Sequence, residues 1–206
     1  MFAFIRKAIR HYRLSQFPHV DKSANIQRKV KVYNKNNLVM GKQTNINSDS
    51  VIMNTHAKFV MGDFSGAAFG LTVITGNHIS VIGKNLKQVT DKDKLRFENA
   101  SEFDKDIIVE EDVWIGARTT LLLGAHIKRG AIIGSGSVVR SVVPPYAIVA
   151  GNPAKIIGFR FTPEEIIKHE AELYEPAARI NPSILEKNYR VYFESKLKNI
   201  NTYLKL

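Results

Sequence analysis

Aliphatic residues recur at every sixth position along much of the chain. The longest set consists of Val109, Ile115, Leu121, Ile127, Ile133 and Val139. Two shorter sets keep the same spacing, namely Met61, Ala67, Val73 and Ile79, and Met40, Ile46 and Ile52. An α-helix repeats about every 3.6 residues and a single strand about every two, so neither sustains a period of six. A solenoid of short strands joined by tight corners does, and the pattern therefore predicts a parallel β-helix.

Two segments interrupt the six-residue period. Residues 84–106 are charged and lack the aliphatic positions, which predicts a loop that protrudes from the coil. Toward the C-terminus the pattern becomes helical. Thr162, Pro163 and Glu165 predict an N-cap, a first-turn proline and a capping box. A second helix is expected from Asn181, and both helices are expected to cap the open end of the solenoid, which would otherwise expose strand edges.

The pattern divides the chain into three regions. Residues 1–18 are predicted to form an amphipathic helix, residues 19–160 the β-helix domain, and residues 161–206 a helical cap. The first region mixes apolar residues with Arg and Lys. Such a helix either packs on the first coil or a neighbouring subunit, or lies on an anionic membrane surface. Peripheral membrane contact through residues 1–16 is therefore one interpretation of this region.

Composition narrows the classes of function. The 206 residues carry 30 Lys and Arg against 19 Asp and Glu, a net charge of +11, which suits an anionic partner. No recognisable nucleic-acid module accompanies this charge. Cysteine is absent, which excludes disulfides, thiolate metal sites and a cysteine acyl-enzyme. No apolar run approaches the roughly 20 residues of a membrane span, and the apolar start lacks a signal-peptide cleavage site, so a cytoplasmic location is expected.

The segment from Val113 to Gly158 resembles a known family. It reads VWIGARTTLLLGAHIKRGAIIGSGSVVRSVVPPYAIVAGNPAKIIG. Its VWIG, GSGSVV and PPYAIVAGNPAK phrases resemble the hexapeptide-repeat acyltransferases, which include galactoside, maltose, xenobiotic and polysaccharide acetyltransferases. The resemblance covers roughly residues 38–160 and implies a homotrimer with active sites at subunit interfaces. The expected fold is mainly β, a left-handed parallel β-helix with an N-terminal helix, a loop at residues 84–106 and a C-terminal helical cap.

The resemblance also suggests a catalytic base. Acyl transfer from a thioester needs a group that takes the acceptor's proton, and imidazole suits this role near neutral pH. His78, in TGNHIS, matches the family's catalytic histidine and precedes the predicted loop. Asn77 is expected to bind the acceptor. An ordinary exposed histidine at a loop base and a turn asparagine are the alternatives, and His56, in an irregular insertion between repeat sets, is not expected to contribute.

By the same resemblance, the acyl donor is acetyl-coenzyme A and no metal is involved. Trp114 precedes an inward position and is expected to project outward, where it lines the donor cleft or packs against a neighbouring subunit. The other matching cofactor-contact positions are Ala117, Ser135, Arg140, Ser141, Lys155 and Arg160. The cations among them would meet the donor's phosphates. Relatives often carry Thr-Lys-Asp at residues 140–142, where this chain has Arg-Ser-Val.

The expected function is acetyl-CoA-dependent O-acetyl transfer to a carbohydrate, such as a capsule or lipopolysaccharide sugar, or to another small molecule. Direct attack in a ternary complex is expected, because no cysteine and no serine with a recognisable histidine partner offers a covalent nucleophile. N-acetyl transfer to an amino sugar or small amine and a non-catalytic scaffold are the alternatives. A zinc hydro-lyase on the same solenoid would need three converging imidazoles, and the chain has no paired histidines.

Overall fold

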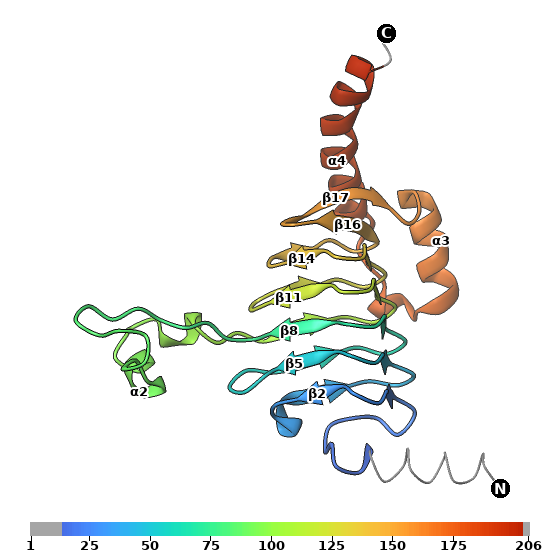
Figure 1. The fold of residues 1–206 in the computed structure, drawn as a ribbon. Coiled ribbons are helices and arrows are strands. Elements are labelled where there is room, and N and C mark those ends of the chain that lie inside the picture. Colours follow the sequence, from blue (N-terminus) through green and yellow to red (C-terminus); the bar gives the residue numbers. More distant parts are fainter. Residues whose placement is uncertain (1–13, 204–206) are drawn as a thin grey trace, which may run out of the picture.

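A computed structural model describes residues 14–203 of the chain. Most of these residues form a three-sided prism of stacked coils, with helices at the C-terminal end and a long excursion on one side (Figure 1). The predicted left-handed parallel β-helix is confirmed. The N-terminal helix predicted for residues 1–18 falls mainly on residues 1–13, which lie outside the described residues.

Each side of the prism is one sheet, because the chain visits the three sides in turn. The first sheet contains β1 (Asn25–Ile26), β4 (Asn45–Ile46), β7 (Gly66–Ala67), β10 (Trp114–Ile115), β13 (Ile132–Ile133), β16 (Ala147–Gly151) and β17 (Ala154–Phe159). The second sheet contains β2 (Lys31–Val32), β5 (Val51–Met53), β8 (Thr72–Ile74), β11 (Thr120–Leu122) and β14 (Val138–Val139). The third sheet contains β3 (Leu38–Met40), β6 (Phe59–Met61), β9 (Ile107–Val109), β12 (His126–Ile127) and β15 (Val142–Val143).

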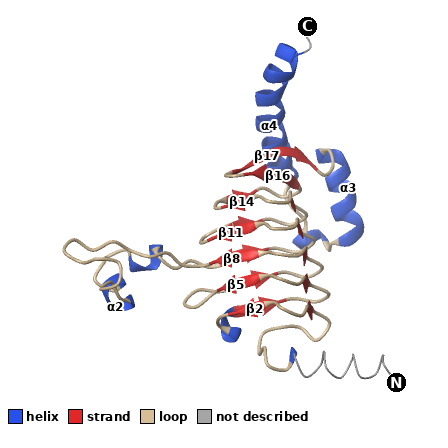
Figure 2. Cartoon of the chain, in the orientation of Figure 1, coloured by secondary structure: helices blue, strands red, loops and turns tan. Residues whose placement is uncertain are grey.

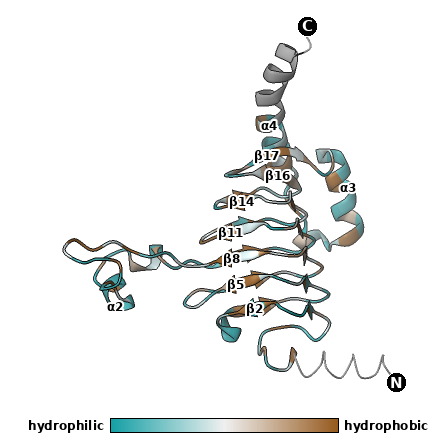
Figure 3. Cartoon of the chain, in the orientation of Figure 1, coloured by the Kyte–Doolittle hydropathy of each residue, from teal (hydrophilic) through white to brown (hydrophobic). Residues whose placement is uncertain are grey.

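The aliphatic residues at every sixth position fill the interior of the prism. Every member of the set from Val109 to Val139 is at most 2% exposed. Parallel pairing places equivalent positions of successive coils beside each other, as Ile115 lies between Ala67 and Ile133. Figure 3 shows hydrophobic residues on strands such as β2 and β5 and mostly hydrophilic ones on α2. The aliphatic ladder therefore stabilises the stack by burying apolar surface between coils.

One coil is opened by a long excursion, which we call the arm (residues 76–104). Its two ends lie side by side, because the Asn77 N–H donates to the Phe103 carbonyl at 2.8 Å and the Lys105 N–H donates to the Thr75 carbonyl at 2.9 Å. The arm extends away from the prism and contains two short helices, α2 (Asp91–Lys94) and η2 (Ala100–Glu102) (Figure 2). The predicted protruding loop is thus present.

The arm begins earlier than the sequence pattern indicated. The chain leaves the coil at Gly76, whereas the aperiodic segment was expected from residue 84. Ile79 is buried but lies on no coil strand, and β9 fills the third side of this coil instead. The assignment of Ile79 to an inward coil position is therefore wrong. Ile79 follows Val73 by six residues in the sequence, but this spacing is a coincidence, because the chain leaves the coil at Gly76, between the two residues.

A buried carboxylate organises the inside of the arm. Asp93, which is 1% exposed, accepts hydrogen bonds from Lys84 Nζ at 2.6 Å and from the Thr90 N–H at 2.8 Å. The hydrogen bond from Lys84, followed by that from Thr90, lowers the pKa of Asp93 to about 2. Because the folded pKa lies below the unfolded one, this contribution to stability is complete above about pH 5 and is lost as the pH falls toward 1.

Asp93→Asn is expected to loosen the arm while leaving the prism folded, because an amide cannot neutralise Lys84. Limited trypsin digestion at neutral pH should cut the arm several-fold faster than in the wild type, at an unchanged midpoint of thermal unfolding. Glu98→Gln, which removes an exposed arm carboxylate, is the matched control and should leave the cleavage rate unchanged. Equal cleavage of both variants would contradict the role given to Asp93.

The chain closes the first sheet with an antiparallel strand before it turns helical. β17 pairs with β16 and covers its edge. α3 (Pro163–Leu173) then begins with the predicted capping box, in which Glu165 and Thr162 hydrogen-bond reciprocally. After η3 (Pro176–Ala178), α4 (Pro182–Tyr203) starts next to β17 and projects beyond it along the prism axis (Figure 1). No helix in the described part of the chain is long and apolar enough to cross a membrane.

A second buried carboxylate fastens α3 to the prism. Glu170 is 1% exposed and accepts hydrogen bonds from Tyr146 Oη at 2.6 Å, Arg129 Nη1 at 2.8 Å and the Ile180 N–H at 3.0 Å. Arg129 also pairs with Glu111 at 2.6 Å. Burial, together with the hydrogen bond to Glu170, raises the pKa of Tyr146. The neutral phenol therefore remains a hydrogen-bond donor to Glu170 across the physiological pH range.

Candidate active site

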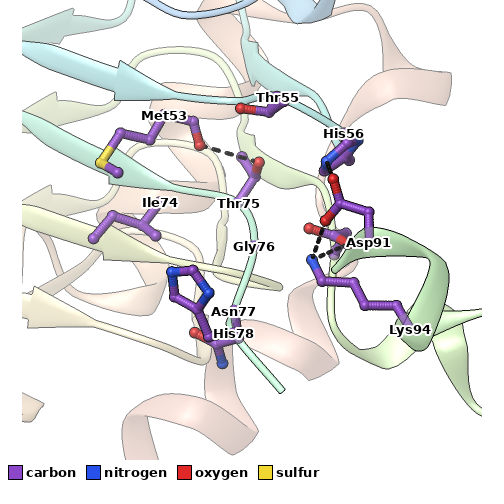
Figure 4. Close-up of a pocket in the computed structure, with 11 residues that line it drawn as sticks. Met53, Thr55, His56, Ile74, Thr75, Gly76, Asn77, His78, Asp91 and Lys94 are labelled. Carbon is purple, nitrogen blue, oxygen red and sulfur yellow. Dashed lines mark hydrogen bonds and ion pairs between the residues drawn. The ribbon is translucent and has the colours of Figure 1, made fainter. Parts of the chain in front are cut away.

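His78 lies where the arm leaves the prism, four residues after β8 ends. It opens onto a hollow of about 200 Å³ between the coil and the arm. The lining residues are Met53, Thr55, His56, Ile74, Thr75, Gly76, Asn77, His78, Asp91, Lys94 and Asp104 (Figure 4). His78 and Asn77 are both exposed to solvent. Among the described residues no hydrogen-bond partner of the His78 ring is found.

Ion pairs hold the arm over this hollow. His56 Nε2, on the turn between β5 and β6, lies 3.3 Å from Asp91 Oδ2 at the start of α2. Lys94 Nζ lies 2.8 Å from Asp104 Oδ2 and 4.0 Å from Asp91 Oδ1. The same four side chains line a second hollow of about 450 Å³, whose remaining lining is Lys92, Leu95, Ala100 and Ser101. The ion pairs thus form a wall between the His78 hollow and a partly apolar hollow inside the arm.

Trp114 lies on a different side of the prism. It projects from β10 on the first sheet and is 47% exposed. Its ring lies over Gly66, where a Cβ would come within 3.3 Å of the indole and within 2.7 Å of Asn45 Oδ1. A hollow of about 320 Å³ surrounds it, lined by Asn45, Phe64, Gly66, Asp112, Val113, Trp114, Ile132 and Arg160. Gly66 therefore leaves the space that an outward indole needs.

Three of the other predicted cofactor residues lie on or next to strands of the first sheet, which also carries Trp114. Ala117 and Ser135 follow β10 and β13 at the edge between the first and second sheets, and the Gly136 N–H donates to the Ala117 carbonyl at 2.8 Å. Lys155 is exposed on β17, paired in register with Ala150.

Arg160 is already engaged within the chain. Its guanidinium donates to Asp112 Oδ2 at 2.7 Å and to the Gly130 carbonyl at 3.1 Å. Arg160 lines the Trp114 hollow with its guanidinium bound to the chain, whereas Lys155 is exposed and does not line this hollow. No sequence pattern predicted this pairing, because Asp112 precedes Arg160 by 48 residues.

Arg140 and Ser141 lie on the edge that carries His78. Both are exposed at the corner between β14 and β15, where the second sheet meets the third, two coils beyond the arm. The predicted site residues thus fall into two groups, one at the edge between the second and third sheets and one on or beside the first sheet. His78, Asn77, Arg140 and Ser141 form one group, and Trp114, Ala117, Ser135, Lys155 and Arg160 form the other.

The remaining coil histidine is part of a surface ion pair. His126 Nε2, on β12, lies 2.8 Å from Glu110 Oε1. Within residues 14–203, no three His, Cys, Asp or Glu side chains are grouped so as to hold a metal ion.

Comparison with known proteins identifies relatives for part of the chain. No family model matches it. A chloramphenicol acetyltransferase of Klebsiella aerogenes is 54% identical over 59 residues, which cover 29% of this chain and 28% of that protein. A probable macrolide acetyltransferase of Lysinibacillus sphaericus is 37% identical over 110 residues, which cover 53% of this chain and 56% of that protein. The chain thus spans from about a quarter to just over half the length of these relatives.

Solved structures match over more of the chain. A maltose O-acetyltransferase from Clostridium difficile 630 superposes with a TM-score of 0.56 at 21% identity, over 71% of this chain and 72% of that one. A hexapeptide-repeat-containing acetyltransferase from Vibrio cholerae superposes with a TM-score of 0.59 at 24% identity, over 74% of this chain and 80% of that one. The chain has the fold of the hexapeptide-repeat acetyltransferases. The family resemblance that the VWIG-to-GNPAK segment indicated is confirmed for the fold.

His56 lies beside the His78 hollow, a position that the six-residue period did not indicate. The turn between β5 and β6 carries an irregular insertion, and that irregularity was its sequence signal. Its partner Asp91 comes from the arm, 35 residues later, and the six-residue period says nothing about where an excursion folds back. His56 was not expected to contribute to the site, yet in the structure it lines the same hollow as His78.

Proposed function

We propose that this hexapeptide-repeat protein transfers an acetyl group from acetyl-CoA to a hydroxyl of a carbohydrate or another small molecule. The observation that carries the proposal is the position of His78, on a coil edge beside a hollow that the arm encloses. Its curated relatives are described as acetyltransferases, and a solved structure of the same fold is described as complexed with acetyl coenzyme A. Acetyl-CoA as donor is consistent with both descriptions.

The proposed chemistry is one direct displacement. His78 takes the proton of the acceptor hydroxyl as its oxygen attacks the thioester carbonyl. Asn77, which is exposed beside His78 in the same hollow, positions the acceptor. Backbone N–H groups of the cleft stabilise the oxyanion of the tetrahedral intermediate. The C–S bond then breaks, the protonated His78 gives its proton to the thiolate of coenzyme A, and the acetyl ester leaves.

The division of the site residues between two edges favours a site shared by two subunits. Within one chain Trp114 and His78 face different directions, and each lies in a hollow that is open to solvent. In the proposed homotrimer, the Trp114 group of one subunit holds the donor against the His78 group of the next. Arg140 and Lys155 are exposed cations available to the donor's phosphates, whereas Arg160 supports the cleft through Asp112.

The arm offers the acceptor both apolar and polar side chains. Leu95 and Ala100 give the arm hollow an apolar part, whereas Asp91, Lys94 and Asp104 supply polar groups toward His78. An acceptor with a reactive hydroxyl and an apolar portion fits both hollows. The names of the chloramphenicol and macrolide acetyltransferase relatives are compatible with such an acceptor.

His56→Gln and Asp91→Asn are expected to weaken acceptor binding without impairing the donor site. Either change removes the exposed coil-to-arm contact between His56 and Asp91, and exposed contacts of this kind are worth up to about 1 kcal/mol. The KM for the acceptor should rise about two- to fivefold, at similar kcat and unchanged KM for acetyl-CoA. Steady-state kinetics measures this, with Lys87→Gln on the exposed arm as the control. A fall in kcat with unchanged acceptor KM would contradict the positioning role.

The function is tested by combining calorimetry with a thiol-release assay. Acetyl-CoA is titrated into the full chain, and release of coenzyme A is followed with sugars, amphenicols, macrolides and amines as acceptors. Saturable donor binding with turnover on a hydroxyl acceptor supports the proposal, and mass spectrometry of the product identifies the acetylated atom. Turnover on amines alone would reassign the reaction to N-acetyl transfer. A folded protein without donor binding would leave the scaffold interpretation.

A further inference from the structure

The positive charge of the protein is concentrated at one end of the sequence. Ten of the 30 Lys and Arg residues, but only one of the 19 Asp and Glu residues, fall within residues 1–42. That segment therefore contributes +9 of the net charge of +11, and the remainder of the chain is nearly neutral. The basic excess is thus separate from the residues assigned to the donor and acceptor.

The described part of this segment exposes its cations. The first coil contains β1, β2, the 3₁₀ helix η1 (Lys35–Asn37) and β3. Its exposed cations, with the first residue of the next turn, are Lys22, Arg28, Lys29, Lys31, Lys35 and Lys42. Of these, Lys29 alone lies within ion-pair distance of a carboxylate among the described residues, at 4.0 Å from Asp49 in a pair that is mostly exposed. Further along the chain, several cations have carboxylate partners, among them Lys84, Lys94, Arg129 and Arg160.

These cations surround the end of the prism and do not converge on a cavity. Arg28 and Lys29 lie at the corner between the first and second sheets, and Lys31 lies on β2 in the second sheet. Lys22 and Lys42 precede β1 and β4 at another corner. Figure 3 shows η1 as a hydrophilic turn beside β2, at the end of the prism opposite α4. A ring of this kind matches an extended anionic surface better than a single phosphate group.

An exposed aromatic residue accompanies the ring. Tyr33 is 63% exposed and lies between Lys31 and Lys35 in sequence. Aromatic side chains with a polar tip favour the membrane–water interface, and clustered Lys and Arg are attracted to anionic headgroups. The sequence that precedes the first coil, MFAFIRKAIRHYR, combines apolar and basic residues in the same way.

We propose that the first coil is a membrane-docking end that binds anionic lipid headgroups through Lys22, Arg28, Lys31 and Lys42. This binding is separate from the proposed acetyl transfer, because none of the four residues lines either hollow at the arm or the hollow at Trp114. Attraction to the headgroups supplies the affinity, so the binding weakens as the ionic strength rises.

Vesicle flotation with the full chain tests the proposal. Vesicles of phosphatidylcholine alone are compared with vesicles that contain phosphatidylglycerol as the anionic lipid. The wild type is expected to bind the anionic vesicles only, and added salt should release it. The quadruple variant K22Q/R28Q/K31Q/K42Q should bind at least roughly tenfold more weakly. The matched control K58Q/K87Q/K168Q/K187Q removes four exposed cations elsewhere and should bind within about twofold of the wild type.

Three results would overturn the proposal. The wild type could ignore anionic vesicles, or the two quadruple variants could lose binding equally. Retention on heparin without vesicle binding would assign the basic end to an anionic polymer instead. Thermal unfolding and acetyl transfer are measured on both variants and should match the wild type, which separates this proposal from loss of folding and from failure of the proposed function.

Discussion

Replacing His78 with alanine is expected to lower kcat by about 10²–10⁴-fold, the usual contribution of a general base. The affinity for acetyl-CoA should change little, because in the proposed reaction His78 acts on the acceptor hydroxyl whereas the Trp114 hollow holds the donor. Calorimetric titration of the donor and thiol-release kinetics on the same preparation measure both quantities. Unchanged turnover in the folded variant would remove His78 from the mechanism.

Trp114→Ala is the complementary control for this experiment. It should weaken donor binding, because it empties the hollow over Gly66, while His78 and the arm are untouched. If the site lies between subunits, trimers mixed from His78→Ala and Trp114→Ala chains regain activity, because some interfaces then carry both native residues. Absence of recovery in verified mixed trimers would argue that one chain contains the whole site.

Replacing Glu170 with alanine is expected to cost about 3 kcal/mol in the free energy of unfolding. This is the low end of the range for breaking a buried ion pair, because Glu111 still neutralises Arg129 after the change. The hydroxyl of Tyr146 and the Ile180 N–H also lose their acceptor. Chemical denaturation followed by circular dichroism measures the loss.

Glu172→Ala provides the matched control on the same helix. Glu172 is exposed, so its removal should change the free energy of unfolding by no more than about 0.5 kcal/mol. Equal effects of the two substitutions would show that Glu170 does not fasten α3 to the prism. A larger effect of Glu170→Ala on α3 alone, seen as faster hydrogen exchange there, would still agree with the proposed attachment.

The sequence predicted the features that depend on local geometry. Each side of the prism needs one inward aliphatic residue, so the fold appears as a period of six from Val109 to Val139. The capping box at Thr162 and Glu165 is similarly local, because both partners lie within one helical turn. The start of α4 at Pro182 follows from the same kind of signal.

The features that the sequence did not predict are contacts between distant segments. Glu170 meets Arg129 across 41 residues, and His56 meets Asp91 across 35. A repeat pattern fixes which residues point inward, but the partners of outward polar side chains depend on how the arm and α3 fold back. The early start of the arm was hidden for the same reason, because Ile79 fits the spacing without occupying a coil strand.

The paired ends of the arm have a consequence for how such proteins diversify. Because Thr75 and Lys105 are hydrogen-bonded neighbours, the coil resumes in register whatever lies between them. Doubling a flexible insertion costs only about 0.6 kcal/mol in closure entropy. The arm is therefore a graft site, at which arms of other lengths and chemistries can be exchanged beside an unaltered His78. Under the proposed function, replacing this one insertion would change the acceptor range while the coil that carries His78 stays the same.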